Sequence, residues 1–275
     1  KEKSSIVALC KKLFVTSSGY HAWRKRKPSL RAINNEKLLI EIRRVHQQSN
    51  ECYGYPRVHA KLKQEGIHCG RHRVARLMQE NDIKGKKFRR YRKHRPQHHI
   101  ADNSTNLLRK REPVNTINQV WVGDITFIRV GDEWSYLSVV MDLYSRKILS
   151  WSFSKYRSAN LVSKTVLVAI KENDCTSETI CHTDQGCEYT SHLYVNTLKE
   201  HDLQMSMSRK GHCWDNANME SFFHSLKTEM IYFNKFQTLE EAKAHITDYM
   251  NFYNHDRIHS GINYLTPVLC EKQAA

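Results

Sequence analysis

Residues 119–155 read QVWVGDITFIRVGDEWSYLSVVMDLYSRKILSWSFSK, and this stretch decides the fold of the second half of the chain. Runs rich in β-branched and aromatic residues occupy positions 120–130, 134–143 and 148–153. Short polar turns at 131–133 and 145–147 separate these runs. Such runs, bounded by turn residues, are typical of β-strands. The pattern therefore predicts a three-stranded antiparallel meander.

The residues after the meander alternate between helical and strand-like patterns. Ser158 is a suitable N-cap for an amphipathic helix that continues to residue 172. Two further helices are predicted at 192–200 and 216–233, and two short strands at 179–182 and 203–207. A meander followed by helices and two more strands describes a mixed five-stranded α/β sheet of the ribonuclease H type.

Charge is divided unevenly between the two halves of the chain. The 275 residues include 44 Lys and Arg against 28 Asp and Glu, which gives a formal net charge of +16. Residues 1–112 carry a net charge of +20, whereas residues 113–275 carry −4. A strongly basic half is typical of a region that binds a polyanion. We expect the acidic residues of the other half to serve a different purpose.

The composition excludes several classes of protein. With 40% hydrophobic residues the chain has enough apolar material for a core, which argues against disorder. The mean hydropathy is −0.66, and no apolar run approaches the roughly 18 residues that a membrane-spanning helix needs. The eight cysteines form no Cys-x-x-Cys pair, so neither a zinc ribbon nor a disulfide scaffold is indicated. Without a secretory signal, we expect a cytoplasmic protein with no membrane partner.

The basic half contains the pattern of a helix-turn-helix. Two short amphipathic helices are predicted at 57–65 and 71–80, joined by a turn between Gly66 and Gly70. The second helix places three basic side chains on its outer face, namely Arg71, Arg73 and Arg76. We interpret residues 35–84 as a DNA-binding helix-turn-helix domain. Residues 1–34 are interpreted as the remnant of another such unit, with its turn at Ser17-Ser18-Gly19. An ordinary helical hairpin has the same pattern, and only the charge favours DNA binding.

A basic run follows this region. Residues 84–95 read KGKKFRRYRKHR, which shows no apolar stripe and no acidic residue. We interpret residues 85–115 as a linker that lies along DNA phosphates, with contacts from Lys86, Lys87, Arg89, Arg90 and Arg92. A merely solvated charge run is the alternative. Residues 116–275 then form the α/β core with a helical C-terminal tail.

Three acidic residues are candidates for chemistry in the core. Asp124 interrupts the first predicted strand, where a carboxylate is costly unless a cation or a basic side chain neutralises it. Asp184 follows the fourth strand, at the sheet edge where open α/β sheets bind ligands, although it could be an ordinary turn residue. Glu220 shares a helix face with Lys227, which by itself also describes a solvated ion pair.

Taken together, the three acids and their neighbours resemble a known family. Three motifs look like the catalytic-core motifs of the DDE transposases and retroviral-type integrases: Trp121-x-x-Asp124-x-Thr126, His182-x-Asp184-x-Gly186-x-x-Tyr189 and Asp215-Asn216-Ala217-x-x-Glu220-Ser221-Phe222-Phe223. Between Asp184 and Glu220 lie 35 residues, the spacing typical of the family. The C-terminal stretch from Tyr253 to Pro267 is similar too. The chain thus resembles the second-frame product of the insertion-sequence-three family of bacterial transposons.

The resemblance implies a metal-dependent DNA strand cleavage and strand transfer reaction. Asp124, Asp184 and Glu220 would hold two Mg²⁺ or Mn²⁺ ions, with Asp124 bridging both. Lys227 would hold a phosphate near the scissile bond, and Asn216 and Trp214 would contact a terminal base or a flanking nucleotide. For Trp214, simple packing of its loop is an equal alternative. The implied partners are double-stranded DNA, namely transposon terminal repeats and target DNA in the nucleoid, and further copies of this chain assembled on DNA.

Two rival functions come from other classes. A helix-turn-helix regulator without catalysis explains the basic half but leaves the three acids without a purpose. A ribonuclease H-like nuclease explains the acids but does not need the helix-turn-helix or the basic linker. Joining of a DNA 3′ end to a second DNA distinguishes a transposase from both.

Overall fold

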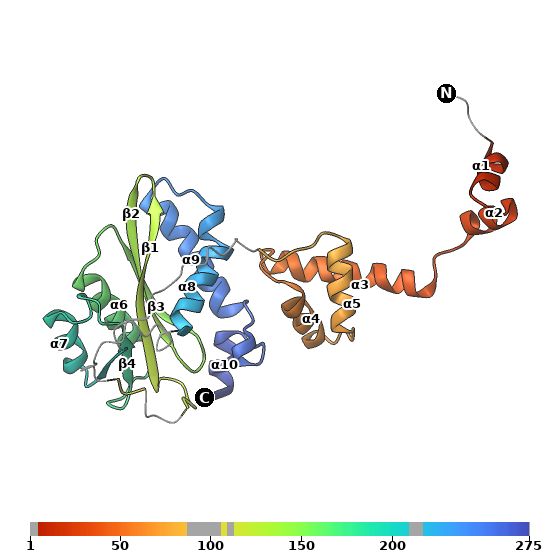
Figure 1. Ribbon diagram of the computed structural model, residues 1–275. Coiled ribbons are helices and arrows are strands. Elements are labelled where there is room, and N and C mark those ends of the chain that lie inside the picture. Colours follow the sequence, from red (N-terminus) through yellow and green to blue (C-terminus); the bar gives the residue numbers. More distant parts are fainter. Residues whose placement is uncertain (1–4, 87–105, 109–112, 209–216, 275) are drawn as a thin grey trace, which may run out of the picture.

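The computed structural model describes residues 5–86, 106–108, 113–208 and 217–274. A five-stranded sheet forms the centre of the second half (Figure 1). Its strands are β1 (Val120–Val130), β2 (Glu133–Asp142), β3 (Ile148–Ser154), β4 (Ile180–Thr183) and β5 (Gln204–Met207). The spatial order is β3-β2-β1-β4-β5. The first three strands pair antiparallel, whereas β4 pairs parallel with β1 and β5 pairs parallel with β4. The predicted meander and the mixed five-stranded α/β sheet are therefore confirmed.

The hairpin between β1 and β2 is long and regular. Its register runs without interruption from the pair Trp121 and Asp142 to the pair Val130 and Glu133. Two residues, Gly131 and Asp132, close it, and Gly131 adopts a φ of +57°, which a glycine tolerates at no steric cost. This hairpin supplies the rigid platform on which Asp124 is placed.

Helices cover both faces of the sheet. On one face α6 (Ala159–Glu172) and α7 (His192–Glu200) bury Trp121 together with Val162 and Leu198. On the other, α8 (Ala217–Glu229) and α9 (Leu239–His255) pack with Val122 in the larger apolar cluster. The two helix layers lie on opposite sides of the strands in Figure 1. The remaining C-terminal elements are the 3₁₀ turns η2 (Ile231–Phe233) and η3 (Ser260–Ile262) and helix α10 (Pro267–Ala274).

The N-terminal half is helical. Helices α3 (Leu30–Gln48), α4 (Tyr55–Gln64) and α5 (Arg71–Glu80) pack around Ile42, Val58, Leu62 and Val74, all with no exposed surface. Pro56 lies in the first turn of α4, where its missing N–H has no partner to lose. Because α3 begins at Leu30, the expected division between residues 34 and 35 falls inside one helix.

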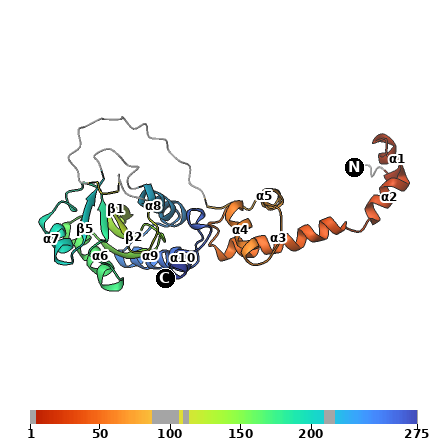
Figure 2. The ribbon, with the colours of Figure 1, turned by 90° about the horizontal axis from the view of Figure 1, so that it is seen from below.

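The first two helices extend away from the rest of the chain (Figures 1 and 2). They are α1 (Ile6–Lys12) and α2 (Ser17–Lys25). We expected Ser17-Ser18-Gly19 to be a turn, but these residues form the first turn of α2. Thr16 explains the difference, since its hydroxyl oxygen accepts a hydrogen bond from the Gly19 N–H at 3.1 Å and caps the helix. In the described part of the chain, every helix is too short or too polar to cross a membrane.

Candidate active site on the sheet edge

Asp124 lies in the middle of β1, on the face that α8 covers. Its Oδ1 atom accepts a hydrogen bond from the Ile125 N–H at 2.7 Å. The preceding residue, Gly123, faces the neighbouring strand so closely that an added Cβ would lie 3.2 Å from Thr183 Cγ2. A glycine at this position therefore allows β1 and β4 to approach at the level of Asp124.

Asp184 follows β4 directly, next to Asp124 in the sheet. The parallel register pairs Val120 with Ile180 and Val122 with His182, and two residues further along the same register reach Asp124 and Asp184. Asp184 Oδ1 accepts a hydrogen bond from the Gly186 N–H at 2.9 Å. A Cβ at Gly186 would lie 2.9 Å from the same oxygen, so the Asp-x-Gly motif leaves room for the carboxylate.

Glu220 lies in the first turn of α8, and its charge acts on Asp124. The pKa of Asp124 is raised to about 7, first because the carboxyl is buried and next because Asp184 and Glu220 repel its charge. The 35-residue spacing therefore brings the three acids into one electrostatic group.

Lys227, in the last turn of α8, also interacts with Asp124. Its ammonium lies 4.4 Å from the centroid of the Phe127 ring, and the Asp124 charge acts on it. Burial lowers the pKa of Lys227. A hollow of about 630 Å³ opens beside it, lined by half-exposed rings and by basic side chains, among them Phe127, Trp134, Tyr232, Arg129 and Lys235. Rings interleaved with cations are the surface that unpaired nucleotides prefer.

Arg157 is a residue that sequence reasoning missed. Its guanidinium forms two contacts with Glu188, from Nε to Oε1 at 2.6 Å and from Nη2 to Oε2 at 2.9 Å. The positive charge of Arg157 also acts on Asp124, whose pKa it lowers. Nothing in the local pattern marks Arg157, because its partner is 31 positions away. The only hint in the sequence is the acidic partner itself, because Glu188 lies four residues after Asp184.

The donor set of this site suits a hard divalent cation. The charges of Asp184 and Glu220 act on Asp124, and carboxylate oxygens are the ligands that Mg²⁺ and Mn²⁺ prefer. Within the described ranges, no three His, Cys, Asp or Glu side chains are arranged closely enough to hold a metal ion by themselves. The three residues fit the ion by the chemistry and charge of their donor atoms.

The expected DNA contacts of the basic half are only partly accessible. Arg71 and Arg76 are exposed on α5, where Arg76 pairs with Glu80 at 3.1 Å. Arg73 is not on the outer face as expected, because it flanks the buried stripe of α5 and its Nε donates to Asn35 Oδ1 of α3 at 2.8 Å. The Nζ atom of Lys86 lies 5.5 Å from the centroid of the Phe233 ring. Six expected contacts lie outside the described residues, namely Lys87, Arg89, Arg90, Arg92, Trp214 and Asn216.

Comparison with known proteins agrees with this geometry. Residues 115–213 and 220–274 match families described as integrase core domains, and residues 33–93 match an HTH-like domain. An uncharacterised 31 kDa protein of insertion element IS600 from Shigella sonnei is 34% identical over 94% of this chain and 96% of its own length. Transposase InsF for insertion sequence IS3A from Escherichia coli K12 is 35% identical over 96% of this chain and 92% of its own length.

A solved structure agrees at the level of the fold. A chain of the simian T-cell lymphotropic virus intasome, in complex with PP2A regulatory subunit B56 gamma, superimposes with a TM-score of 0.50 at 20% identity. The match covers 77% of this chain and 73% of that chain. The present chain belongs to the family of insertion-sequence DNA transposases that includes InsF, DDE-type enzymes in which a helix-turn-helix region precedes an integrase catalytic core.

Proposed function

We propose that Asp124, Asp184 and Glu220 are the residues at which this transposase cleaves and joins DNA. The observation that carries the proposal is the parallel register of β1 and β4, which places Asp184 beside the buried Asp124. The charges of Asp184 and Glu220 both act on Asp124 and add to the effect of burial in raising its pKa. An integrase-type core implies dependence on a divalent metal ion. Two such ions, held by Asp124, Asp184 and Glu220, would supply positive charge that stabilises the charge developing on the reacting phosphate.

The protein side chains bind and orient the DNA for two displacements at phosphorus. In cleavage, a water oxygen forms a bond to the phosphorus and the bond to the 3′ oxygen breaks, which leaves a 3′-hydroxyl. In joining, that hydroxyl oxygen bonds to a target phosphorus and the target bond to its own 3′ oxygen breaks. Lys227 holds a phosphate next to the reacting one, because its half-buried ammonium interacts with Asp124 and lines the hollow beside Phe127.

The substrate follows from the same surfaces. The exposed Arg71 and Arg76 of α5 contact the terminal repeats of the element, and the basic segment from Lys86 to Arg92 binds phosphates. Asn216 and Trp214, just before α8, contact the terminal nucleotides. Paired joining needs two element ends at one target in the nucleoid, so the active form is a multimer assembled on DNA.

Joining of a labelled element end to a plasmid tests this proposal. With Mg²⁺ or Mn²⁺ the purified protein is expected to nick the end and to join it to the plasmid, and excess chelator is expected to stop both reactions. Nicking without joining would favour a nuclease, and binding without either reaction would favour a regulator. Activity in excess chelator would contradict the proposal.

A further inference from the structure

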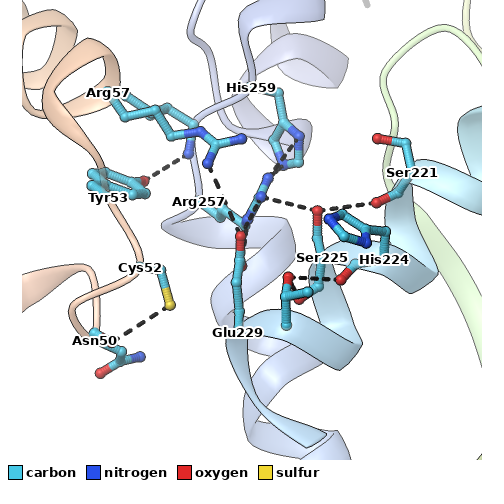
Figure 3. Close-up of polar contacts among 12 residues, drawn as sticks. Asn50, Cys52, Tyr53, Arg57, Ser221, His224, Ser225, Glu229, Arg257 and His259 are labelled. Carbon is cyan, nitrogen blue, oxygen red and sulfur yellow. Dashed lines mark hydrogen bonds and ion pairs between the residues drawn. The ribbon is translucent and has the colours of Figure 1, made fainter. Parts of the chain in front are cut away.

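A buried polar cluster lies away from the carboxylate site, where the helix-turn-helix region meets the core (Figure 3). At its centre is Arg257, which follows α9 and is only 2% exposed. Its guanidinium grips Glu229 with two hydrogen bonds, from Nε at 2.8 Å and from Nη2 at 2.6 Å. The Tyr249 hydroxyl donates to the same carboxylate at 2.9 Å. Glu229 is thus the acceptor on which the cluster converges.

The helix-turn-helix region reaches into this cluster. The Tyr53 hydroxyl, between α3 and α4, donates to the Asp256 carbonyl oxygen at 3.0 Å and accepts from the Ile258 N–H at 2.8 Å. Arg57 of α4 approaches Glu229 with 4.0 Å between Nη1 and Oε1. These pairs join residues at least 172 positions apart along the chain. In Figure 3, Tyr53 and Arg57 point from the N-terminal helices towards Arg257 and Glu229.

The chemistry of these contacts favours one orientation of the two regions. Tyr53 is 3% exposed, so its hydroxyl, the Asp256 carbonyl and the Ile258 amide have to satisfy one another. Buried hydrogen bonds are directional, and sliding one region over the other would leave several polar groups without partners. Apolar residues of both regions, including Tyr53, Val58, Phe252 and Ile258, also belong to one continuous buried cluster. The contact between the two regions is therefore buried and hydrogen-bonded, like the interior of a single domain.

Helix α8 connects this cluster to the carboxylate site. Glu220 lies in its first turn and Glu229 is its last residue. Nine residues correspond to about two and a half turns, so the two glutamates lie on opposite faces of the helix. Lys227, seven residues after Glu220, returns to the face of Glu220. Helix α8 therefore presents Glu220 and Lys227 on one face, and on the opposite face Arg257 and Arg57 contact its Glu229.

We infer that Tyr53, Arg57, Glu229 and Arg257 are positioning residues that fix the helix-turn-helix region against α8. The protein thereby sets both the length and the rotational phase of DNA between the segment bound by α5 and the phosphate that reacts. The inference rests on the proposed function, because it assigns a role in placing the DNA that the carboxylates cut. None of the four residues touches the reacting atoms.

Hydrogen exchange tests the fixed contact without any DNA. In Tyr53→Phe the Ile258 amide loses its acceptor, and its exchange is expected to become at least tenfold faster than in the wild-type protein. Tyr249→Phe is the matched control, because it removes a buried hydroxyl from the same Glu229 carboxylate within the core alone. Its Ile258 amide is expected to stay within threefold of wild type. Equal exchange of Ile258 in the wild-type protein and Tyr53→Phe would overturn the inference.

Cleavage of spaced DNA tests the positioning role. The probe is a duplex of the element end that the wild-type protein nicks, with five or ten base pairs inserted between the footprint of the helix-turn-helix region and the nick. Five base pairs rotate the DNA by about half a turn. For wild type and Tyr249→Phe, both insertions are expected to lower nicking at that end at least tenfold. For Tyr53→Phe the loss is expected to shrink below threefold, with nicks at several positions.

The outcomes separate this inference from the proposed function. Wild-type nicking that stays within threefold across all spacings would overturn the positioning role while leaving the carboxylate site intact. If the wild-type protein nicks no duplex with Mg²⁺ or Mn²⁺, the proposed function fails, and with it the role in placing DNA for cleavage. The exchange of Ile258 then still decides whether the two regions are held in one orientation. A merely stabilising role would lower the melting temperature of Tyr53→Phe and Tyr249→Phe alike without changing the dependence on spacing.

Discussion

The two glutamates of α8 lie in opposite electrostatic surroundings. Glu220, at the start of the helix, faces Asp124 and Asp184, and repulsion among these acids contributes to the raised pKa of Asp124. Glu229, at the end of the helix, is enclosed by two guanidinium groups and a tyrosine hydroxyl. In the first group the acids repel Asp124 more than the nearby Arg157 attracts it, whereas in the second group each charge is paired. The comparison shows that one helix can carry a site built for chemistry and a site built for fixed geometry.

The largest expected effect is the loss of DNA cleavage when one of the three acids around Asp124 is changed. Asp124→Asn, Asp184→Asn and Glu220→Gln each remove a charge that would hold a metal ion, so DNA nicking is expected to fall at least about 1,000-fold. DNA affinity is expected to remain within about threefold, because the basic half provides the phosphate contacts. Nicking and gel-shift assays measure the two quantities.

A matched control for these variants is Glu178→Gln, which removes a charge from an exposed residue just before β4. It is expected to nick DNA at the wild-type rate. If one of the three acid variants still joined DNA at that rate, its residue would not belong to the site.

The next effect is on stability when the second group is changed. Glu229→Gln leaves Arg257 buried without its counter-charge, which is expected to cost about 3 to 5 kcal/mol of unfolding free energy. Glu271→Gln is the control, since Glu271 pairs with Lys147 at 2.7 Å in a more exposed place and should cost at most about 1 kcal/mol. Denaturant unfolding measures both.

Asp124→Asn also removes one negative charge, but at a place where neighbouring acids repel that charge. Without metal it is therefore not expected to lower the free energy of unfolding. Similar losses for Glu229→Gln and Asp124→Asn would remove the contrast between the two groups.

The smallest effect is on the pH dependence of stability. Burial and the charges of Arg257, Arg57 and Arg146 lower the pKa of His259 to about 2, so the folded protein keeps this imidazole neutral. The unfolded chain takes up a proton near pH 6.5, and His259 therefore contributes stability that is complete above this pH and is lost as the pH falls towards 2. Between pH 6.5 and 5 the loss should stay below about 2 kcal/mol. His259→Gln is expected to flatten the curve of unfolding free energy between pH 6.5 and 5, and parallel curves would contradict the assignment.

Local patterns were sufficient to predict most of the secondary structure. Alternating and amphipathic runs predicted the three strands of the meander and the helix after Ser158 to within a residue or two. Such patterns work because strand and helix formation depends on neighbours within a few positions. The turn expected at residues 17–19 was wrong because a side-chain cap at Thr16 outweighed the local preference of Ser and Gly.

The site was predicted less completely than the fold. The spacing and the flanking motifs were enough to select Asp124, Asp184 and Glu220 as candidates. In the structure Asp184 lies beside Asp124, and the charge of Glu220 acts on Asp124. Arg73 was expected to face outwards but is held by Asn35, and Arg157 was missed. In both cases the partner is more than 30 positions away, so no local pattern reveals the contact.

The amino-acid sequence by itself determined the strands, the helices and the three acids, because each depends on short-range pattern or on a fixed spacing. Only the tertiary structure decided that Glu229 and Arg257 are buried, and that Tyr53 joins the basic half to the core. A Glu and an Arg look the same in a sequence whether they lie in water or in an interface. Their roles depend on desolvation, which is settled only when distant segments pack together.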